Sequence, residues 1–349
     1  MSDETGNARR GTRKRRRMWR AGVLVLLLPP LWNLAATKQQ HARNPVPGEF
    51  YTVRGGQMHI ACSGAGSPAV VIEAAASASW LAWEGVQQQL SDTTRVCTYD
   101  RAGHGWSEPR SGPRDAEAIV AELHELLDAA AVQRPLVLAG HSAGGLYVRA
   151  YSRKFPHEVA GVALIDASSP GQLDELPGWR ESYEKQRAER NGELWKERLA
   201  VWSGWERVRG RCRNEPSPAR QHLAGQYNAL MCRPAYVGGD ESEFMDFETT
   251  ARQAGLLTTF GRVPLLIISR DAESPTDTRE TLDIAVDSVW DREQDAMKNL
   301  SPLSWRVVAG GAGHAVHHDR LDLVVRQMTT LVGAVRGGPA PPYGRTVKE

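Results

Sequence analysis

The segment Gly140-His141-Ser142-Ala143-Gly144 has the form G-x-S-x-G. In this pattern the serine hydroxyl can act as a nucleophile. An apolar run at 135–139 precedes it, and a run with helical spacing of apolar residues follows it. A sharp turn from strand to helix would hold Ser142 in a strained backbone conformation, with glycines where a Cβ would collide. The hydroxyl would then lie at a helix N-terminus, which stabilises developing negative charge. We therefore predict Ser142 as the nucleophile.

A serine nucleophile requires a base, and His314 is the candidate among the histidines. It ends the glycine-rich segment 310–314, between the last predicted strand and the last predicted helix. Such a loop allows the imidazole to fold back over the edge of a sheet toward Ser142. The order serine, acid, histidine along the chain fits one known arrangement of such sites.

Three carboxylates compete to orient the imidazole of His314. Asp271 and Glu273 follow the seventh predicted strand, and Asp166 ends the sixth. A buried carboxylate at any of these positions could accept the imidazole N–H and stabilise the imidazolium. The residues alone leave all three open.

The elements that must position these residues alternate between strands and helices. Apolar or alternating runs predict eight strands, at 49–53, 57–62, 69–72, 95–99, 135–139, 159–165, 263–268 and 305–309. Helical patterns cover 80–90, 115–132 and 320–335. This alternation predicts an α/β fold with a mostly parallel sheet and helices on both faces.

The predicted order of segments divides the chain into five parts. Residues 1–44 form a terminal segment, 45–170 and 263–336 form the two halves of the core, and 337–349 form a Gly/Pro-rich tail that we expect to be disordered. Between the sixth and seventh strands, residues 171–262 are rich in Arg, Glu, Gln and Trp and contain no strand-like run. They predict a helical insertion above the carboxyl edge of the sheet, where ligands bind in such folds.

The terminal segment is basic and then hydrophobic. Residues 1–20 carry eight Lys or Arg against two acidic residues, and an apolar stretch at 21–36 follows. This order is typical of a secretory signal or a signal anchor, so we expect the folded body to be exported or anchored to a membrane. Cleavage and retention of the segment are both compatible with the sequence. A nucleic-acid-binding arm is the alternative for such a basic run, but the apolar stretch argues against it.

The four cysteines form no C-x-x-C pair, which argues against a zinc ribbon or a thioredoxin-type site. An exported body would permit disulfides. We predict a disulfide between Cys212 and Cys232 in the insertion, with two free thiols there as the alternative. Cys62 and Cys97 lie in predicted strands and are expected to be small core residues.

Four segments make the chain resemble the α/β-hydrolase superfamily: 70–76, 99–107, 140–144 and Gly313-His314. The resemblance covers about 45–335 and is greatest to bacterial exported or membrane-tethered serine hydrolases of the esterase and lipase type. It implies an eight-stranded α/β-hydrolase fold with a helical cap between strands 6 and 7. It also favours Asp271 as the acid of a Ser142, His314 and Asp271 triad, with Glu273 and Asp166 as alternatives.

Two backbone N–H groups are expected to bind the oxyanion. One belongs to Ala143, directly after the nucleophile, and the resemblance assigns the other to Ala76. Members of the superfamily usually have a glycine-rich turn at the second position, whereas this chain has alanines at 74–76. The pair Asp100-Arg101 also matches the superfamily, and we expect it to brace the loop beneath the serine turn.

These observations predict a serine hydrolase that cleaves a small, apolar ester through an acyl-enzyme, with an amide or thioester as other possible substrates. Epoxide hydrolases and haloalkane dehalogenases of the superfamily carry Asp where this chain has Ser142, which argues against both. No cofactor, metal or nucleic acid is implied. The N-terminal segment is the part of the chain that would contact the membrane. The alternative function is a noncatalytic ligand-binding protein with the same fold.

Overall fold

The computed structural model describes residues 28–210, 218–230, 233–271, 281–339 and 341–349. The chain divides into two compact units. One comprises Met1–Val46 and Glu193–Val237, and the other comprises Pro47–Gly192 and Gly238–Glu349. The sheet and all the candidate site residues that the structure describes belong to the second unit.

In the described part of the chain, nine strands form one sheet, in the order β1-β2-β4-β3-β5-β6-β7-β8-β9. The strands are β1 Glu49–Val53, β2 Gly56–Ser63, β3 Ala69–Glu73, β4 Val96–Tyr99, β5 Leu136–His141, β6 Val159–Ile165, β7 Leu265–Arg270, β8 Ser304–Ala309 and β9 Thr346–Lys348. The β1–β2 and β2–β4 pairs are antiparallel, and the other pairs are parallel. The mostly parallel sheet predicted from the sequence is therefore confirmed.

The ninth strand corrects two predictions, the count of eight strands and the disordered tail at 337–349. Residues 346–348 pair with 306–308 of β8 in parallel register. The backbone N–H of Gly310 also donates to the carbonyl of Glu349, at 2.7 Å. The short strand covers the edge of β8, whose backbone groups would otherwise face solvent. The glycines and prolines that suggested disorder lie before this strand, at 337–344.

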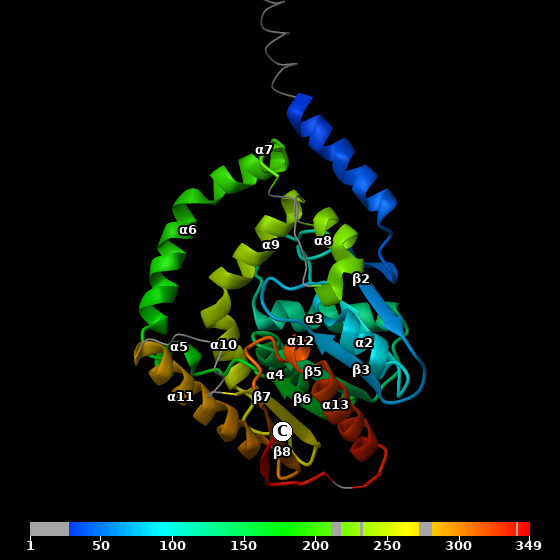
Figure 1. Ribbon diagram of the computed structural model, residues 1–349, viewed down its shortest axis with the longest axis vertical. Coiled ribbons are helices and arrows are strands. Elements are labelled where there is room, and N and C mark those ends of the chain that lie inside the picture. The colour runs from blue at the N-terminus through cyan, green and yellow to red at the C-terminus, as the bar shows by residue number, and fades with distance from the viewer. Residues whose placement is uncertain (1–27, 211–217, 231–232, 272–280, 340) are drawn as a thin grey trace, which may run out of the picture. The chain divides into compact units, whose positions relative to one another are not determined.

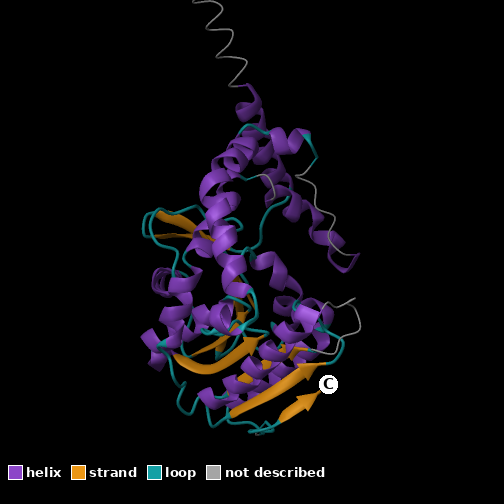
Figure 2. Cartoon of the chain, turned by 90° about the vertical axis from the view of Figure 1, so that its left-hand side faces the viewer, coloured by secondary structure: helices purple, strands orange, loops and turns teal. Residues whose placement is uncertain are grey.

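Helices cover both faces of the sheet (Figures 1 and 2). Side chains of successive strand residues point to opposite faces. Along β3, Val71 accordingly belongs to the core shared with α3 (Ala116–Ala129) and α4 (Gly144–Lys154), whereas Val70 and Ile72 belong to the core shared with α2 (Glu84–Leu90) and α13 (Leu321–Val335). Burial of the sheet on both faces explains why its central strands, such as β3, are continuous apolar runs in the sequence.

The helical insertion lies between β6 and β7 in the sequence, as predicted. Its helices are α5 Gln172–Glu175, α6 Trp179–Trp202, α7 Trp205–Val208, α8 Ala224–Leu230, α9 Pro234–Met245 and α10 Phe247–Gly255. The boundaries of the compact units cross the insertion, because 193–237 groups with the N-terminal residues. A further helix, α11 (Thr281–Ala296), lies between β7 and β8 and was not predicted.

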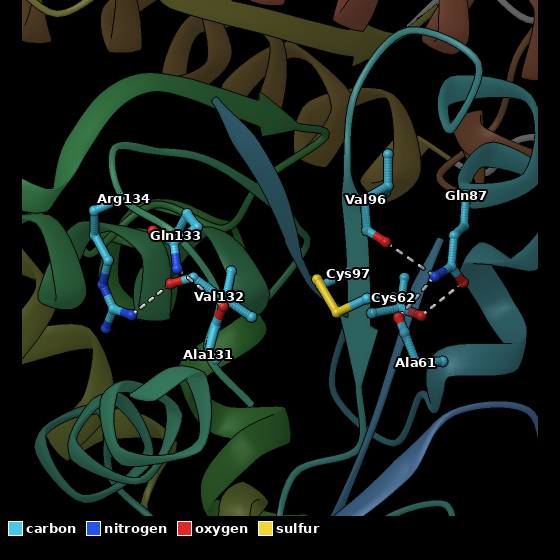
Figure 3. The surroundings of a disulfide bond; sticks show 10 residues. Ala61, Cys62, Gln87, Val96, Cys97, Ala131, Val132, Gln133 and Arg134 are labelled. Atoms are coloured by element: carbon cyan, nitrogen blue, oxygen red, sulfur yellow. Dashed lines mark hydrogen bonds between the residues drawn. A yellow bond between two sulfur atoms is a disulfide. The ribbon is translucent and has the colours of Figure 1, made fainter. Parts of the chain in front are cut away.

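A disulfide joins Cys62 of β2 to Cys97 of β4 (Figure 3). The antiparallel register places the two cysteines directly opposite each other, with Cα atoms 4.1 Å apart. Gln87 of α2 donates from Nε2 to the carbonyls of Ala61 and Val96, at 2.7 and 3.1 Å, and so contacts both strands beside the bridge. Cys97 is buried in the core as expected, but the expectation of two separate small core residues did not include this bridge. The predicted Cys212–Cys232 bridge lies outside the described residues.

In the other unit, residues 28–43 form a helix that bonds to the segment around α7. Asn33 donates to the carbonyl of Val201 at 2.8 Å, and Arg207 donates to Asn33, Thr37 and Gln40 at 2.8–3.0 Å. Of the helices in the described residues, none is long and apolar enough to cross a membrane.

Candidate active site

Ser142 lies in the turn between β5 and α4 with φ at +52°, in the left-handed region. L-residues rarely adopt this conformation, and it persists where surrounding contacts impose it. Those contacts require the two flanking glycines. A Cβ at Gly140 would lie 2.6 Å from the carbonyl oxygen of Gly144, and a Cβ at Gly144 would lie 2.3 Å from that of Glu73. The strained turn predicted from the sequence is present.

His314 lies on the loop after β8 and forms a 2.6 Å hydrogen bond from Nδ1 to Oδ2 of Asp166. Its ring centroid is 4.8 Å from that of His141, the residue before Ser142. The glycine-rich loop therefore brings His314 back to the serine turn, as the sequence predicted. Since Asp166 accepts at Nδ1, Nε2 is the nitrogen that can act as a base.

Asp166 is fully buried at the end of β6 and has φ at +39°. Besides His314, it accepts from Nε1 of Trp290 at 2.9 Å and from the backbone N–H of Arg270 at 3.0 Å. The Arg270 guanidinium lies 3.3 Å away. Burial raises the pKa of Asp166, but the hydrogen bond from His314 and the charge of Arg270 outweigh it and hold the pKa below its usual range. Asp166 is therefore an ionised carboxylate hydrogen-bonded to the ring of His314.

The pairing with Asp166 corrects the prediction of Asp271. Asp271 accepts from the backbone N–H of Gly311 at 3.1 Å and forms an ion pair with Lys348 at 3.2 Å. It therefore supports the base of the histidine loop. β6 and β7 are neighbours, so Asp166 and Asp271 both end at the same edge of the sheet. The unpredicted helix α11 supplies Trp290, which helps to hold the Asp166 carboxylate. Glu273, the third candidate, lies outside the described residues.

His141, within the serine motif, makes a contact that its sequence context did not indicate. Its Nε2 donates to the backbone carbonyl of His314 at 2.8 Å and so ties the histidine loop to the serine turn. Burial and the nearby charge of His314 lower the pKa of His141 to about 4. A neutral imidazole keeps one N–H for this bond and adds no second charge beside His314.

The predicted oxyanion donors, Ala76 and Ala143, line one cavity together with Ser142. The alanines at 74–76 have no positive φ, and Ser77 takes the left-handed conformation instead, at +59°. Alanine is therefore compatible with this loop. Asp100 accepts from the backbone N–H of Trp80, which follows this loop, and from that of Trp106, at 2.8 and 2.9 Å.

The cavity has a volume of about 310 Å³. Its polar lining comes from Ser142, Ser168, Gln172, Ser182 and Gln186, and its apolar lining comes from Ala76, Ala143, Leu173, Trp179, Tyr183, Phe244 and Phe247. The insertion thus supplies most of the walls, through α5, α6, α9 and α10. Trp179 lines the cavity, whereas Trp202 and Trp205 are half exposed in the other unit. In the described residues, no group of three or more His, Cys, Asp or Glu could hold a metal ion.

Residues 68–192, which include the serine turn, match the family model described as alpha/beta hydrolase fold. An esterase from Thermogutta terrifontis has a similar structure, with a TM-score of 0.59, 21% identity, and coverage of 83% of this chain and 98% of that one. This chain has the α/β-hydrolase fold. The same fold is found in the epoxide hydrolase CorEH, with a TM-score of 0.60, 16% identity, and coverage of 82% of this chain and 98% of that one. It is also found in the haloalkane dehalogenase DatA from Agrobacterium tumefaciens, with a TM-score of 0.58, 17% identity, and coverage of 84% and 99%.

Curated relatives of this α/β-hydrolase-fold chain match it over shorter stretches. The probable transporter efuK of Hormonema carpetanum is 31% identical over 116 residues, which cover 32% of this chain and 17% of the relative. The 2-hydroxy-6-oxo-2,4-heptadienoate hydrolase of Pseudomonas putida is 34% identical over 107 residues, which cover 30% and 38%. The matches thus span less than half the length of either relative.

The lowered pKa of His141 predicts a pH-dependent stability. The folded pKa of about 4 lies below the ordinary 6.5, so the unfolded chain binds more protons between these pH values. The free energy of unfolding should therefore fall as the pH falls from 6.5 to 4, by about 3 kcal/mol from this residue. Urea unfolding at several pH values should show a smaller loss in His141→Gln. The exposed His157→Gln serves as the control and should match the wild type, and equal slopes in all three proteins would contradict the prediction.

Proposed function

We propose that this protein is a serine hydrolase that cleaves a carboxylic ester through an acyl-enzyme, with Ser142 as nucleophile, His314 as base and Asp166 as orienting acid. The observation that carries the proposal is the His314–Asp166 hydrogen bond of 2.6 Å beside a serine held at φ +52°. Orienting a base by a buried carboxylate serves proton transfer, and a binding protein with this fold would not need it. This arrangement favours the enzyme over the noncatalytic alternative.

In the proposed reaction, Oγ of Ser142 attacks the substrate carbonyl carbon while Nε2 of His314 takes the hydroxyl proton. The N–H groups of Ala143 and Ala76 stabilise the oxyanion of the tetrahedral intermediate. The intermediate collapses to the acyl-enzyme, and His314 returns the proton to the departing alcohol. Water, activated by His314, then attacks the acyl-enzyme, and Ser142 and the free acid are released. Asp166 remains ionised throughout and stabilises the imidazolium.

The cavity favours a small, uncharged and largely apolar substrate. Its lining residues include none with a formal charge, and aromatic rings of Trp179, Tyr183, Phe244 and Phe247 form part of it. A volume of about 310 Å³ is at the lower end for sites of small molecules. An ester with a short or medium acyl chain fits these properties. Amides and thioesters would follow the same route.

The proposal also places the protein at a membrane, through its N-terminal segment. The basic residues 1–20 are followed by the apolar residues 21–36, whose described part belongs to the helix at 28–43. There the large apolar side chains of Leu28, Leu31, Trp32 and Leu34 are about half exposed. In the same unit, Leu199, Trp202, Trp205 and Val208 are exposed as well. Exposed leucine and tryptophan beside a basic run are typical of a segment that lies in a membrane interface.

Flotation of the full-length protein with anionic lipid vesicles tests the membrane proposal. The protein should float with the vesicles. Leu31→Glu should lower the partition coefficient roughly tenfold or more, because burial of one leucine contributes about 1.5–3 kcal/mol. The matched control is Leu256→Glu. Leu256 directly follows α10 and is as exposed as Leu31, at 61% against 59%. Full-length protein that stays with the soluble fraction would refute the proposal.

Ser142→Ala should abolish hydrolysis of p-nitrophenyl butyrate while leaving the fold intact. The loss should reach several orders of magnitude, because the substitution removes the proposed nucleophile at the strained turn. A fluorophosphonate probe should label the wild type at Ser142 and leave this variant unlabelled. Ser152→Ala, in the same helix that follows the turn, is the control and should keep wild-type labelling. Hydrolysis retained within about tenfold in Ser142→Ala would exclude this nucleophile.

Asp166→Asn should lower kcat by on the order of 10⁴, because an amide at this position favours the wrong tautomer of His314. Asp271→Asn provides a matched comparison, since Asp271 is also buried at the end of a neighbouring strand. It should keep kcat within about tenfold of the wild type. Steady-state kinetics of the two variants decide the assignment. The reverse pattern would return the role of the acid to Asp271.

A further inference from the structure

Arg101 is a buried guanidinium that contacts the loop after β3 through backbone carbonyls. Its side chain is 2% exposed, and it lies two residues beyond the end of β4. Nη1 donates to the carbonyl of Ala74 at 2.9 Å, and Nη2 donates to the carbonyl of Ala75 at 2.8 Å. Two successive peptide groups of this loop are therefore held by one rigid, planar side chain.

These two peptide groups carry the N–H groups of Ala75 and Ala76. In a planar trans peptide the carbonyl and the N–H point in opposite directions, so fixing one fixes the other. Carbonyls that face Arg101 direct their N–H groups away from it. Ala76 lines the cavity beside Ser142, on the proposed path of the oxyanion. A positive charge on the carbonyl side also polarises the peptide and strengthens its N–H as a donor.

The same guanidinium is held by two buried carboxylates. Glu243 of α9 accepts from Nε at 2.8 Å and from Nη2 at 3.0 Å, and Glu73 at the end of β3 accepts from Nη1 at 2.8 Å. Burial would lower the pKa of Arg101, but these carboxylates raise it well above its usual range, so the group stays cationic. Glu243 directly precedes Phe244, which lines the cavity. Arg101 thus connects the aromatic wall of the cavity to the peptides that would bind the oxyanion.

We propose that Arg101 is a positioning residue that orients the oxyanion-binding peptides at 74–76. Through its ion pair with Glu243, it also connects these peptides to the position of α9. This inference rests on the proposed function. A buried ion pair adds little net stability, because the desolvation of both charges offsets their attraction. Packing alone would not require these buried charges. Holding the peptides at 74–76 gives the charges a function.

Arg101→Lys tests the proposal, because a lysine keeps the charge but cannot hold two carbonyls and a bidentate carboxylate at once. The substrate is p-nitrophenyl butyrate, and the inhibitor is a trifluoromethyl ketone that forms a tetrahedral adduct. We expect kcat to fall by about 10²-fold, as for loss of one oxyanion donor, with KM changed by less than about threefold. The affinity of the inhibitor should fall in the same proportion as kcat/KM.

Arg114→Lys is the matched control. Arg114 is also 2% exposed in its side chain and pairs with a buried carboxylate, Glu122, at 2.8 Å. It should keep kcat within about threefold of the wild type, even where its melting temperature falls as much as that of Arg101→Lys. A kcat of Arg101→Lys within about threefold of an active wild type would overturn the positioning role and leave the proposed function standing. Equal losses in both variants would also overturn it.

If Arg101→Lys does not fold, Glu243→Gln takes its place. Glutamine keeps the size of the side chain but accepts through one oxygen only, so Arg101 loses part of its anchor. A loss of kcat of about fivefold or more, with KM little changed, would support the proposal, and an unchanged kcat would overturn it. A wild type that neither hydrolyses the ester nor reacts with fluorophosphonate would overturn the proposed function, and this inference with it.

Discussion

The left-handed backbone of Ser142 is the constraint on which the rest of the site depends. Such a conformation costs on the order of 1–3 kcal/mol, and the surrounding sheet must impose it. β5 leads into the turn, α4 leads out of it, and the neighbouring strand β3 places the Glu73 carbonyl where a side chain at Gly144 would collide. The hydroxyl is consequently held clear of the core at the start of α4. The cap cavity, the histidine loop and the loop after β3 are all arranged around this one residue.

Two buried charge networks, one around Asp166 and one around Arg101, satisfy their charges in the same manner. Asp166 is surrounded by His314, Trp290 and Arg270, so that its negative charge is fully hydrogen-bonded. Arg101 is surrounded by carbonyls and two carboxylates, so that its positive charge is equally satisfied. Buried charges are stable only with such partners. One network includes the ring of His314, and the other holds the peptides of the loop after β3.

The fold by itself does not identify the reaction, because an esterase, an epoxide hydrolase and a haloalkane dehalogenase resemble this chain with nearly equal TM-scores. The side chain at the turn carries the chemical information. In the proposed reaction the hydroxyl needs a base to accept its proton, and this base is His314, which is hydrogen-bonded to a buried carboxylate. Aromatic rings form part of the cavity wall beside Ser142. Function in this fold is therefore argued from the residues of the site.

The sequence alone predicted the parallel sheet, the position of the helical insertion, the serine turn and the return of the His314 loop to that turn, because these follow from local apolar patterns and glycine spacing. Which acid faces His314 was decided only by tertiary structure, since β6 and β7 end at one edge and Trp290 and Arg270 select Asp166. The Cys62–Cys97 bridge depends on the register of two strands distant in sequence. The strand at 346–348 is too short to predict, and it forms by pairing with β8. Local patterns specify elements, whereas pairings between distant residues require the packed sheet.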